Sequence, residues 1–174
     1  SYRLKNYVLC KFNDPLYIVF SSGTTGKPKC ITHSIGGVLI QHAKEHLLHI
    51  NLSEKQKMFY FTTCGWMMWN WLVGSLFCKS SIVLYEGSPF YPNPEHLWKI
   101  AEKSEVSIFG TSAKYIDALS KSNVVPKNHL TSSNLRTICS TGSPLSPDSY
   151  DYILNNIKSD VQIASISGGT DRLS

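Results

Sequence analysis

Residues 20–29 read FSSGTTGKPK, and they follow the apolar, β-favouring run LYIVF at residues 16–20. This pattern predicts a strand that ends in a loop rich in glycine and hydroxyl groups. Glycine tolerates positive φ and lets the backbone approach a ligand closely. A loop that combines these glycines with backbone N–H groups, hydroxyls and two lysines suits a polyphosphate. The residues predicted to bind phosphate are Ser21, Ser22, Gly23, Thr24, Thr25, Gly26, Lys27 and Lys29.

The same stretch is not a Walker A loop, which has four residues between its glycines and ends in Gly-Lys-Ser/Thr. Only Thr24 and Thr25 separate the glycines here, and Pro28, which has no N–H to offer a phosphate, follows Lys27. Taken alone, the stretch is also compatible with an ordinary polar β-turn.

The composition is that of a globular domain. The chain has 174 residues, of which 42% are hydrophobic and 17% charged, and this argues against wholesale disorder. The net charge of +5 is mild, and the basic residues form no long run, so a nucleic-acid partner is not expected. The apolar stretches are too short to span a bilayer, so no transmembrane segment is expected.

Five cysteines, an odd number, form no CxxC pair, which favours reduced thiols and an intracellular, cytosolic compartment. His42, His46 and His49 are spaced to share one face of a helix. A metal site there would need further ligands, and no acidic residue or cysteine completes the set. We therefore predict a solvated helix face.

Strand patterns alternate with helix patterns along the chain, which predicts an α/β fold with a mostly parallel sheet and helices on both faces. Ligands of such sheets lie beyond the carboxyl ends of the strands. We expect the polar loops 21–29, 142–144 and 167–171 to meet at that edge. Strands are predicted at 16–20, 57–63, 81–85, 106–109, 135–139 and 161–166, and helices at 34–50, 65–78, 94–104, 113–122 and 147–157. Ser112 is the predicted N-cap of the helix at 113–122.

Three further segments carry chemistry. In residues 140–153, STGSPLSPDSYDYI, a glycine–proline turn precedes a helix that Ser146 is predicted to cap. In residues 165–171, SISGGTD, the adjacent hydroxyl and carboxylate of Thr170 and Asp171 suit a Mg²⁺–phosphate group. Residues 62–71, TTCGWMMWNW, suit a buried core or the wall of an apolar pocket. Each of the first two, taken alone, is also typical of an ordinary turn.

The four segments, in this order, resemble the adenylate-forming superfamily of acyl-CoA synthetases, luciferases and peptide-synthetase adenylation domains. Within it they are most similar to the acetoacetate-activating CoA ligases, over nearly all of residues 16–171. The resemblance implies that residues 1–174 are part of an AMP-binding domain with ATP, Mg²⁺ and CoA as its ligands, in which acetoacetate is converted to an acyl-adenylate and then to a thioester.

The resemblance also implies roles for individual residues. Thr170 would contact phosphate and Asp171 would hold Mg²⁺, and both count as catalytic. In acetate-activating relatives a tryptophan stands at the position of Gly168, so glycine there implies room for a longer acid. The adenine turn would be Gly142, Ser143 and Pro144, and the acyl pocket Trp66, Met67, Trp69 and Gly168.

Some positions depart from the family pattern. Cys30 replaces a glycine, Ser143 an acidic residue, Ser167 an aromatic residue and Asp171 a glutamate. The family's ribose-binding Asp, hinge Arg and C-terminal lid domain with its Lys are not among these 174 residues. We therefore expect the isolated chain to have weak nucleotide affinity and negligible turnover. The alternatives are a synthetase for another short-chain acid and a non-catalytic product that binds a nucleotide or a protein partner.

Overall fold

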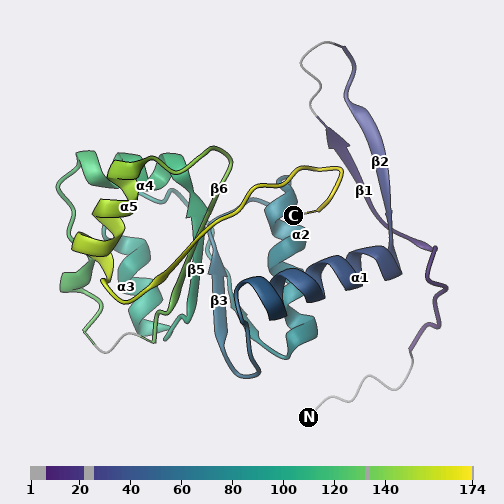
Figure 1. Cartoon of the computed structure of the whole chain (residues 1–174), viewed down its shortest axis with the longest axis horizontal. Helices are drawn as coiled ribbons and strands as arrows, with labels where there is room; N and C mark the ends of the chain where they lie inside the picture. The colour runs from purple at the N-terminus through teal and green to yellow at the C-terminus, as the bar shows by residue number, and fades with distance from the viewer. Residues whose placement is uncertain (1–6, 22–25, 132–133, 174) are drawn as a thin grey trace.

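The computed structural model describes residues 7–21, 26–131 and 134–173. A five-stranded parallel sheet, in the order β4-β3-β5-β6-β7, lies between two groups of helices, and a separate two-stranded hairpin stands beside it (Figure 1). This confirms the predicted α/β class and the largely parallel sheet. The elements are β1 Pro15–Ser21, β2 Lys29–Ser34, α1 Ile35–Ala43, β3 Lys57–Tyr60, α2 Met67–Gly74, β4 Ser81–Val83, α3 His96–Lys103, β5 Ile108–Ser112, α4 Ala113–Lys121, β6 Thr137–Thr141, α5 Pro147–Tyr152 and β7 Gln162–Ser165.

Each sheet strand sends alternate side chains to opposite faces, as the pleat requires. In β3, Phe59 packs in one core, whereas Met58 and Tyr60 pack in the other. The same division separates Phe109 from Ile108 in β5. Both faces are therefore buried, which is the usual state of a parallel sheet.

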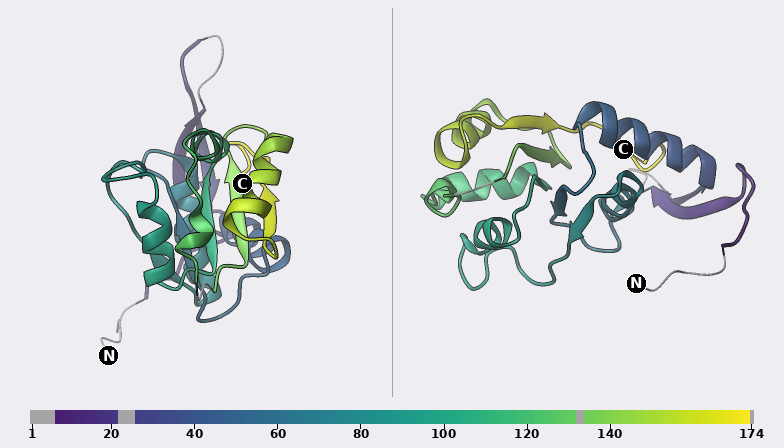
Figure 2. Two further views of the ribbon diagram at one scale, coloured as in Figure 1. Left: turned by 90° about the vertical axis from the view of Figure 1, so that its left-hand side faces the viewer. Right: turned by 90° about the horizontal axis from the view of Figure 1, so that it is seen from below.

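The two cores have different helical covers (Figure 2). Helices α3, α4 and α5 cover one face, where the rings of Trp98 and Phe109 stack with their centroids 4.2 Å apart. Helices α1 and α2 lie on the other side, where Met68 and Trp71 are fully buried. Three short turns extend helices. The π-helical turns Lys44–His49 and Ile153–Ile157 follow α1 and α5, and the 3₁₀ turn Ser75–Cys78 follows α2. A separate 3₁₀ turn spans Pro126–Asn128.

The helix starts follow local capping chemistry. The Ser112 and Ser146 hydroxyls accept hydrogen bonds from the backbone N–H groups of Tyr115 and Ser149, both at 3.2 Å. Both predicted caps are confirmed. The helix predicted from Pro94 begins only at His96, because Asn93 Oδ1 accepts from the backbone N–H of Glu95 at 3.2 Å and holds the preceding residues in a turn.

The hairpin corrects one prediction. Strand β1 does not join the parallel sheet, because β2 returns at once and pairs with it antiparallel, from Ser21 opposite Lys29 to Pro15 opposite Ser34. The described ends of the predicted loop, Ser21 and residues 26–29, therefore lie at the far end of a hairpin that projects from the body (Figure 1). The sequence KCITHS of β2 carries β-favouring Ile31 and Thr32, which give β1 a local partner.

The prediction of a solvated histidine face is wrong for two of the three histidines. His42 and His46 are 2% and 0% exposed, because this side of α1 packs on α2. The Nε2 atom of His46 donates to the carbonyl of Trp71 at 2.9 Å. A Cβ at Gly74 would lie 2.1 Å from His42 Nδ1, so the glycine makes room for that ring. His49 does remain exposed.

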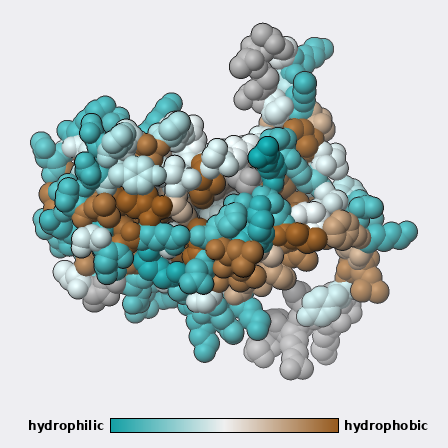
Figure 3. Space-filling model, in the orientation of Figure 1, coloured by the Kyte–Doolittle hydropathy of each residue, from teal (hydrophilic) through white to brown (hydrophobic). Residues whose placement is uncertain are grey.

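Apolar side chains also reach the surface (Figure 3). On β1, Leu16, Ile18 and Phe20 are 44–63% exposed, and Leu47 and Leu48 are exposed at the end of the α1 segment. In the described ranges, no helix combines the length and the apolar character needed to cross a bilayer.

A substitution at Gly110 tests how tightly the sheet packs on α2. A Cβ there would lie 2.0 Å from Cδ2 of Tyr60, a buried ring whose hydroxyl donates to the carbonyl of Thr111 at 3.1 Å. We expect Gly110→Ala to lower the free energy of unfolding by about 1–3 kcal/mol, the usual cost of overpacking. Gly65→Ala, whose Cβ would come no closer than 3.9 Å to Thr63, serves as the control in urea unfolding. Equal stability of the two variants would contradict the expectation.

Candidate functional site

Beyond β7 the chain crosses the carboxyl end of the sheet as a segment that we call the strap, residues 166–173 (Figure 1). Its first residue is fixed to β6, because the Ile166 N–H donates to the Ser140 carbonyl at 2.7 Å and Thr141 Oγ1 donates to the Ile166 carbonyl at 2.8 Å. Its far end turns back, since the N–H groups of Arg172 and Leu173 both donate to the Gly169 carbonyl.

A small cavity of about 150 Å³ lies where the strap, the end of β6 and the start of α2 meet. It brings together three segments that are far apart in the sequence. Gly142 has a φ of +90°, and its Cβ position lies 3.8 Å from the Trp66 ring, so the turn after β6 runs beside the indole. The lining residues are Trp66, Met67, Met68, Thr141, Gly142, Gly168, Gly169 and Thr170.

A larger cavity of about 530 Å³ lies between β1 and the start of α2. Residues 17–20 of β1 line one side and residues 64–67 the other, and Thr170 completes the wall. Thr170 therefore borders both this cavity and the smaller one. This residue links the hairpin side of the site to the side of Gly142.

Of the predicted phosphate residues, the structure describes Ser21, Gly26, Lys27 and Lys29, which lie at the end of β1 and at or just before the start of β2. Ser22, Gly23, Thr24 and Thr25 are outside the described residues. Ser21 is half-buried at the end of β1, and Gly26 has a φ of +121°, which favours glycine. Lys27 and Lys29 are exposed.

Two parts of the predicted site are separated from the small cavity. Ser143 and Pro144 line a shallow cavity of about 210 Å³ together with Lys114 and Asp117 of α4. Trp69 lines another cavity, of about 510 Å³, beside Leu84 and Tyr85 at the carboxyl ends of β3 and β4. Trp69 thus points to a different space from Trp66 and Met67.

Asp171 is exposed next to Thr170, so a carboxylate and a hydroxyl lie side by side on the strap. A Cβ at Gly169 would lie 2.6 Å from Asp171 Oδ1, and the glycine thus permits the carboxylate to fold back on the strap. Oxygen donors of this kind suit Mg²⁺ bound to phosphate. In the described part of the chain, no cluster of three or more His, Cys, Asp or Glu residues is placed to hold a metal ion by itself.

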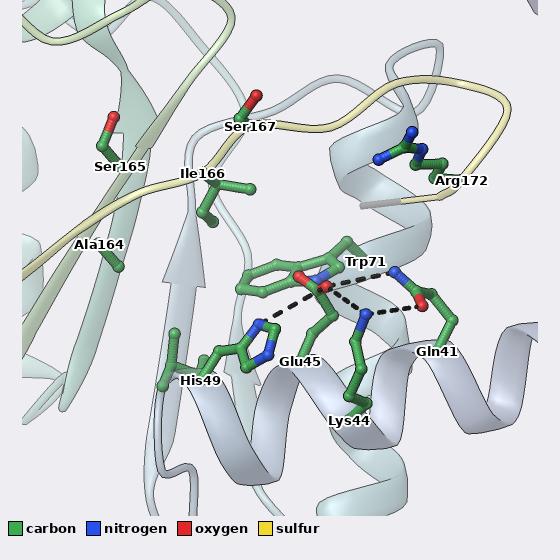
Figure 4. Close-up of a pocket in the computed structure, with 11 residues that line it drawn as sticks. Gln41, Lys44, Glu45, His49, Trp71, Ala164, Ser165, Ile166, Ser167 and Arg172 are labelled. Carbon is green, nitrogen blue, oxygen red and sulfur yellow. Dashed lines mark hydrogen bonds and ion pairs between the residues drawn. The ribbon is translucent and has the colours of Figure 1, made fainter.

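Figure 4 shows a further cavity, of about 520 Å³, on the side of the strap that faces α1. The carboxylate of Glu45 accepts from Gln41 Nε2 and approaches Lys44 Nζ, both at 3.2 Å, and His49 Nδ1 lies 3.7 Å away. The indole of Trp71 lines the same cavity and overlaps the Glu45 carboxylate in this view. None of the predicted site residues lines this cavity, and sequence patterns gave no signal for it.

The structure adds residues to the candidate site. Met68 and Thr141 line the small cavity, and the Nε2 atom of His33 on β2 donates to the carbonyl of Thr170 at 2.8 Å. Met68 belongs to the segment 62–71 that was predicted as core or pocket wall, and Thr141 adjoins the predicted turn at Gly142. For His33 the sequence carried no signal, since its partner lies 137 positions away.

Comparisons with known proteins relate this chain to a family. The model of the AMP-binding enzyme family matches residues 5–165. An acetoacetyl-coenzyme A synthetase of Rhizobium meliloti is 55% identical over 163 residues, and one of Gallus gallus is 52% identical; each match covers 94% of this chain. A solved acetoacetyl-CoA synthetase structure from Streptomyces lividans superposes with a TM-score of 0.90 at 43% identity, covering 97% of this chain.

The chain spans only about a quarter of each of these proteins, namely 25%, 24% and 26% of their lengths. The matched region nevertheless includes the hairpin, the whole parallel sheet and the turn after β6. The chain therefore belongs to the AMP-binding enzyme family.

Proposed function

We propose that this chain is part of an ATP-dependent acid–CoA ligase that activates acetoacetate. In the first half-reaction a carboxylate oxygen attacks the α-phosphorus of ATP, so that an acyl-adenylate forms and pyrophosphate leaves. In the second, the thiol of CoA attacks the acyl carbon and AMP leaves. The chain needs no covalent nucleophile for either step, because the work is positioning and charge stabilisation.

The observation that carries the proposal is the small cavity. Gly142 of the turn predicted for adenine, and Gly168 and Thr170 of the strap, predicted for the acyl group and phosphate, border one space with Trp66. A volume of about 150 Å³ is of the order that a short acid needs. Acetoacetate is favoured because the named relatives act on it and because Gly168 adds no side chain to the cavity.

The positions of the polar residues support the following proposed roles. Thr170 borders the cavity beside β1 and would contact the phosphate chain of ATP, and Lys27 and Lys29 on the hairpin would approach the β- and γ-phosphates. Asp171 would hold Mg²⁺, which offsets charge on the leaving pyrophosphate. Ser143 and Pro144 would lie along the adenine edge, on the α4 side of the Gly142 turn.

The isolated 174-residue chain is expected to give no acid-dependent exchange between ATP and pyrophosphate. We place the missing groups of the site, including the lid domain, in the three quarters of the relatives that this chain does not span. Isotope exchange with acetoacetate and with acetate measures this directly. Robust exchange from the isolated chain would contradict the proposed division of the site. We assign the enzyme to the cytosol, consistent with five unpaired thiols.

A chimaera tests the function itself. Residues 5–171 would replace the matching quarter of the Rhizobium meliloti synthetase, and pyrophosphate release would be measured acid by acid. We expect acetoacetate to be the preferred substrate. A preference for another short acid would support the alternative ligase, and a well-folded chimaera without any acid-dependent turnover would support a non-catalytic product.

A further inference from the structure

The strap that carries Thr170 and Asp171 is held from the side of the hairpin. Nε2 of His33 in β2 donates to the Thr170 carbonyl at 2.8 Å. Farther along, Nε2 of His42 in α1 donates to the Leu173 carbonyl at 3.2 Å. The opposite end of the strap is bound to β6 through Ile166. Its two ends are therefore fixed by different parts of the fold.

The bond from His33 differs from that of His42 in what it connects. His33 lies in β2 opposite Tyr17 of β1, in the strand that continues from Lys29. Thr170 borders the cavity against β1 and the small cavity beside Gly142. A single hydrogen bond thus ties the hairpin that carries the lysines to the loop that carries the Thr170 hydroxyl and the Asp171 carboxylate.

We infer that His33 is a positioning residue for the adenylation step, which sets the distance between the hairpin and the strap. The inference rests on the proposed function. The ring bonds to main chain, so it acts through Thr170 and Asp171 and not on the substrate. Two observations favour such a role. His33 is half-buried, and among the hydrogen bonds of the described residues only the one from His33 to Thr170 joins β2 to the strap.

The role makes a prediction that separates the two half-reactions. Adenylation needs the phosphate-binding groups of the hairpin and of the strap at the correct distance from each other. Thioester formation from an acyl-adenylate involves no β- or γ-phosphate. We expect His33→Leu in the chimaera to lower kcat/KM for pyrophosphate release by about 10- to 100-fold, since small misplacements of reacting groups cost that much. The rate of thioester formation from supplied acyl-adenylate and CoA should stay close to that of the parent, because that step does not use the contact between hairpin and phosphate.

The conservative variant provides the matched control. His33→Gln keeps an N–H donor in place of Nε2 and is expected to recover most of the lost adenylation rate. A merely structural role would depress both half-reactions together and would not be rescued by glutamine. Equal loss in both half-reactions, or no loss in either, would overturn the inference.

A second arm needs no catalysis and uses the 174-residue chain as it stands. Hydrogen–deuterium exchange of the strap amides at residues 170–173 is expected to quicken in His33→Leu and to stay near the parent rate in His33→Gln. Unchanged exchange in the leucine variant would overturn the inference even if the chimaera is active. If the unmodified chimaera shows no acid-dependent pyrophosphate release, the proposed function fails, while this exchange arm still decides whether His33 holds the strap.

Discussion

Replacing Gly168 with tryptophan is expected to lower kcat/KM for acetoacetate by about 100-fold while leaving acetate much less affected. Gly168 lines the cavity of about 150 Å³ together with Trp66 and Met67, and no side chain of its own occupies that space. An indole at this position would fill the part of the cavity that the longer acid needs. One extra or missing methylene group in an apolar pocket typically changes kcat/KM by about 10- to 200-fold, which sets the size of the expected effect.

The comparison is made in the chimaera by measuring pyrophosphate release with both acids. Gly168→Ala, which adds a single methyl group, should show a smaller loss in the same direction. Ser165→Trp places the same indole at an exposed position that lines the cavity between the strap and α1, so it should leave the ratio of the two acids unchanged. An unchanged acid preference in Gly168→Trp would show that the small cavity is not the acyl pocket.

Much of the fold could be predicted because the relevant signals are local. The apolar runs of the five parallel strands, the caps at Ser112 and Ser146 and the apolar stretch that became α2 all follow from nearest neighbours. The strand ends were less predictable. For β5, pairing with β6 extends the strand through Ser112, beyond the apolar run that marks its start.

The hairpin and the buried histidines could not be predicted from local pattern. Whether β1 pairs with β2 or joins the parallel sheet depends on tertiary partners, and a β-favouring run is compatible with both. His42 and His46 have helical spacing on one face, but polar residues at such spacing usually face solvent. Here Gly74 and the Trp71 carbonyl, both on another helix, provide the space and the acceptor.

The candidate site shows the same division. Glycines and hydroxyls after strands marked the turn at Gly142 and the strap, because such loops meet at one edge of a parallel sheet. The contact of His33 with Thr170 joins two segments that no spacing rule relates. Trp66 and Trp69 lie three residues apart in one motif, yet they line different cavities because α2 begins between them.

His46 is expected to make the fold sensitive to acid. Burial lowers the pKa of this imidazole to about 4, despite the opposing effect of its hydrogen bond to the Trp71 carbonyl. The neutral ring is the folded form, because its Nδ1 atom is buried with no hydrogen-bond partner among the described residues, and protonation would place a charged N–H there. Burial also lowers the pKa of His42, so that ring acts in the same direction.

The sign follows from linkage. Between the unfolded pKa of about 6.5 and the folded pKa, the unfolded chain binds more protons, so stability falls as the pH falls. From pH 7 to pH 4, His46 alone should reduce the free energy of unfolding by on the order of 3 kcal/mol. That is a large share of the 5–15 kcal/mol that is typical of folded domains.

Urea unfolding of the parent chain and of His46→Gln at pH 7 and pH 4 measures this difference. Glutamine keeps a donor for the Trp71 carbonyl but does not titrate, so the variant should lose less stability than the parent by about that amount. Protonation of carboxylates affects both chains equally and cancels in the comparison. If the two chains lost the same stability over this range, His46 would be protonated in the folded state as easily as in the unfolded one, and its burial between α1 and α2 would have no electrostatic cost.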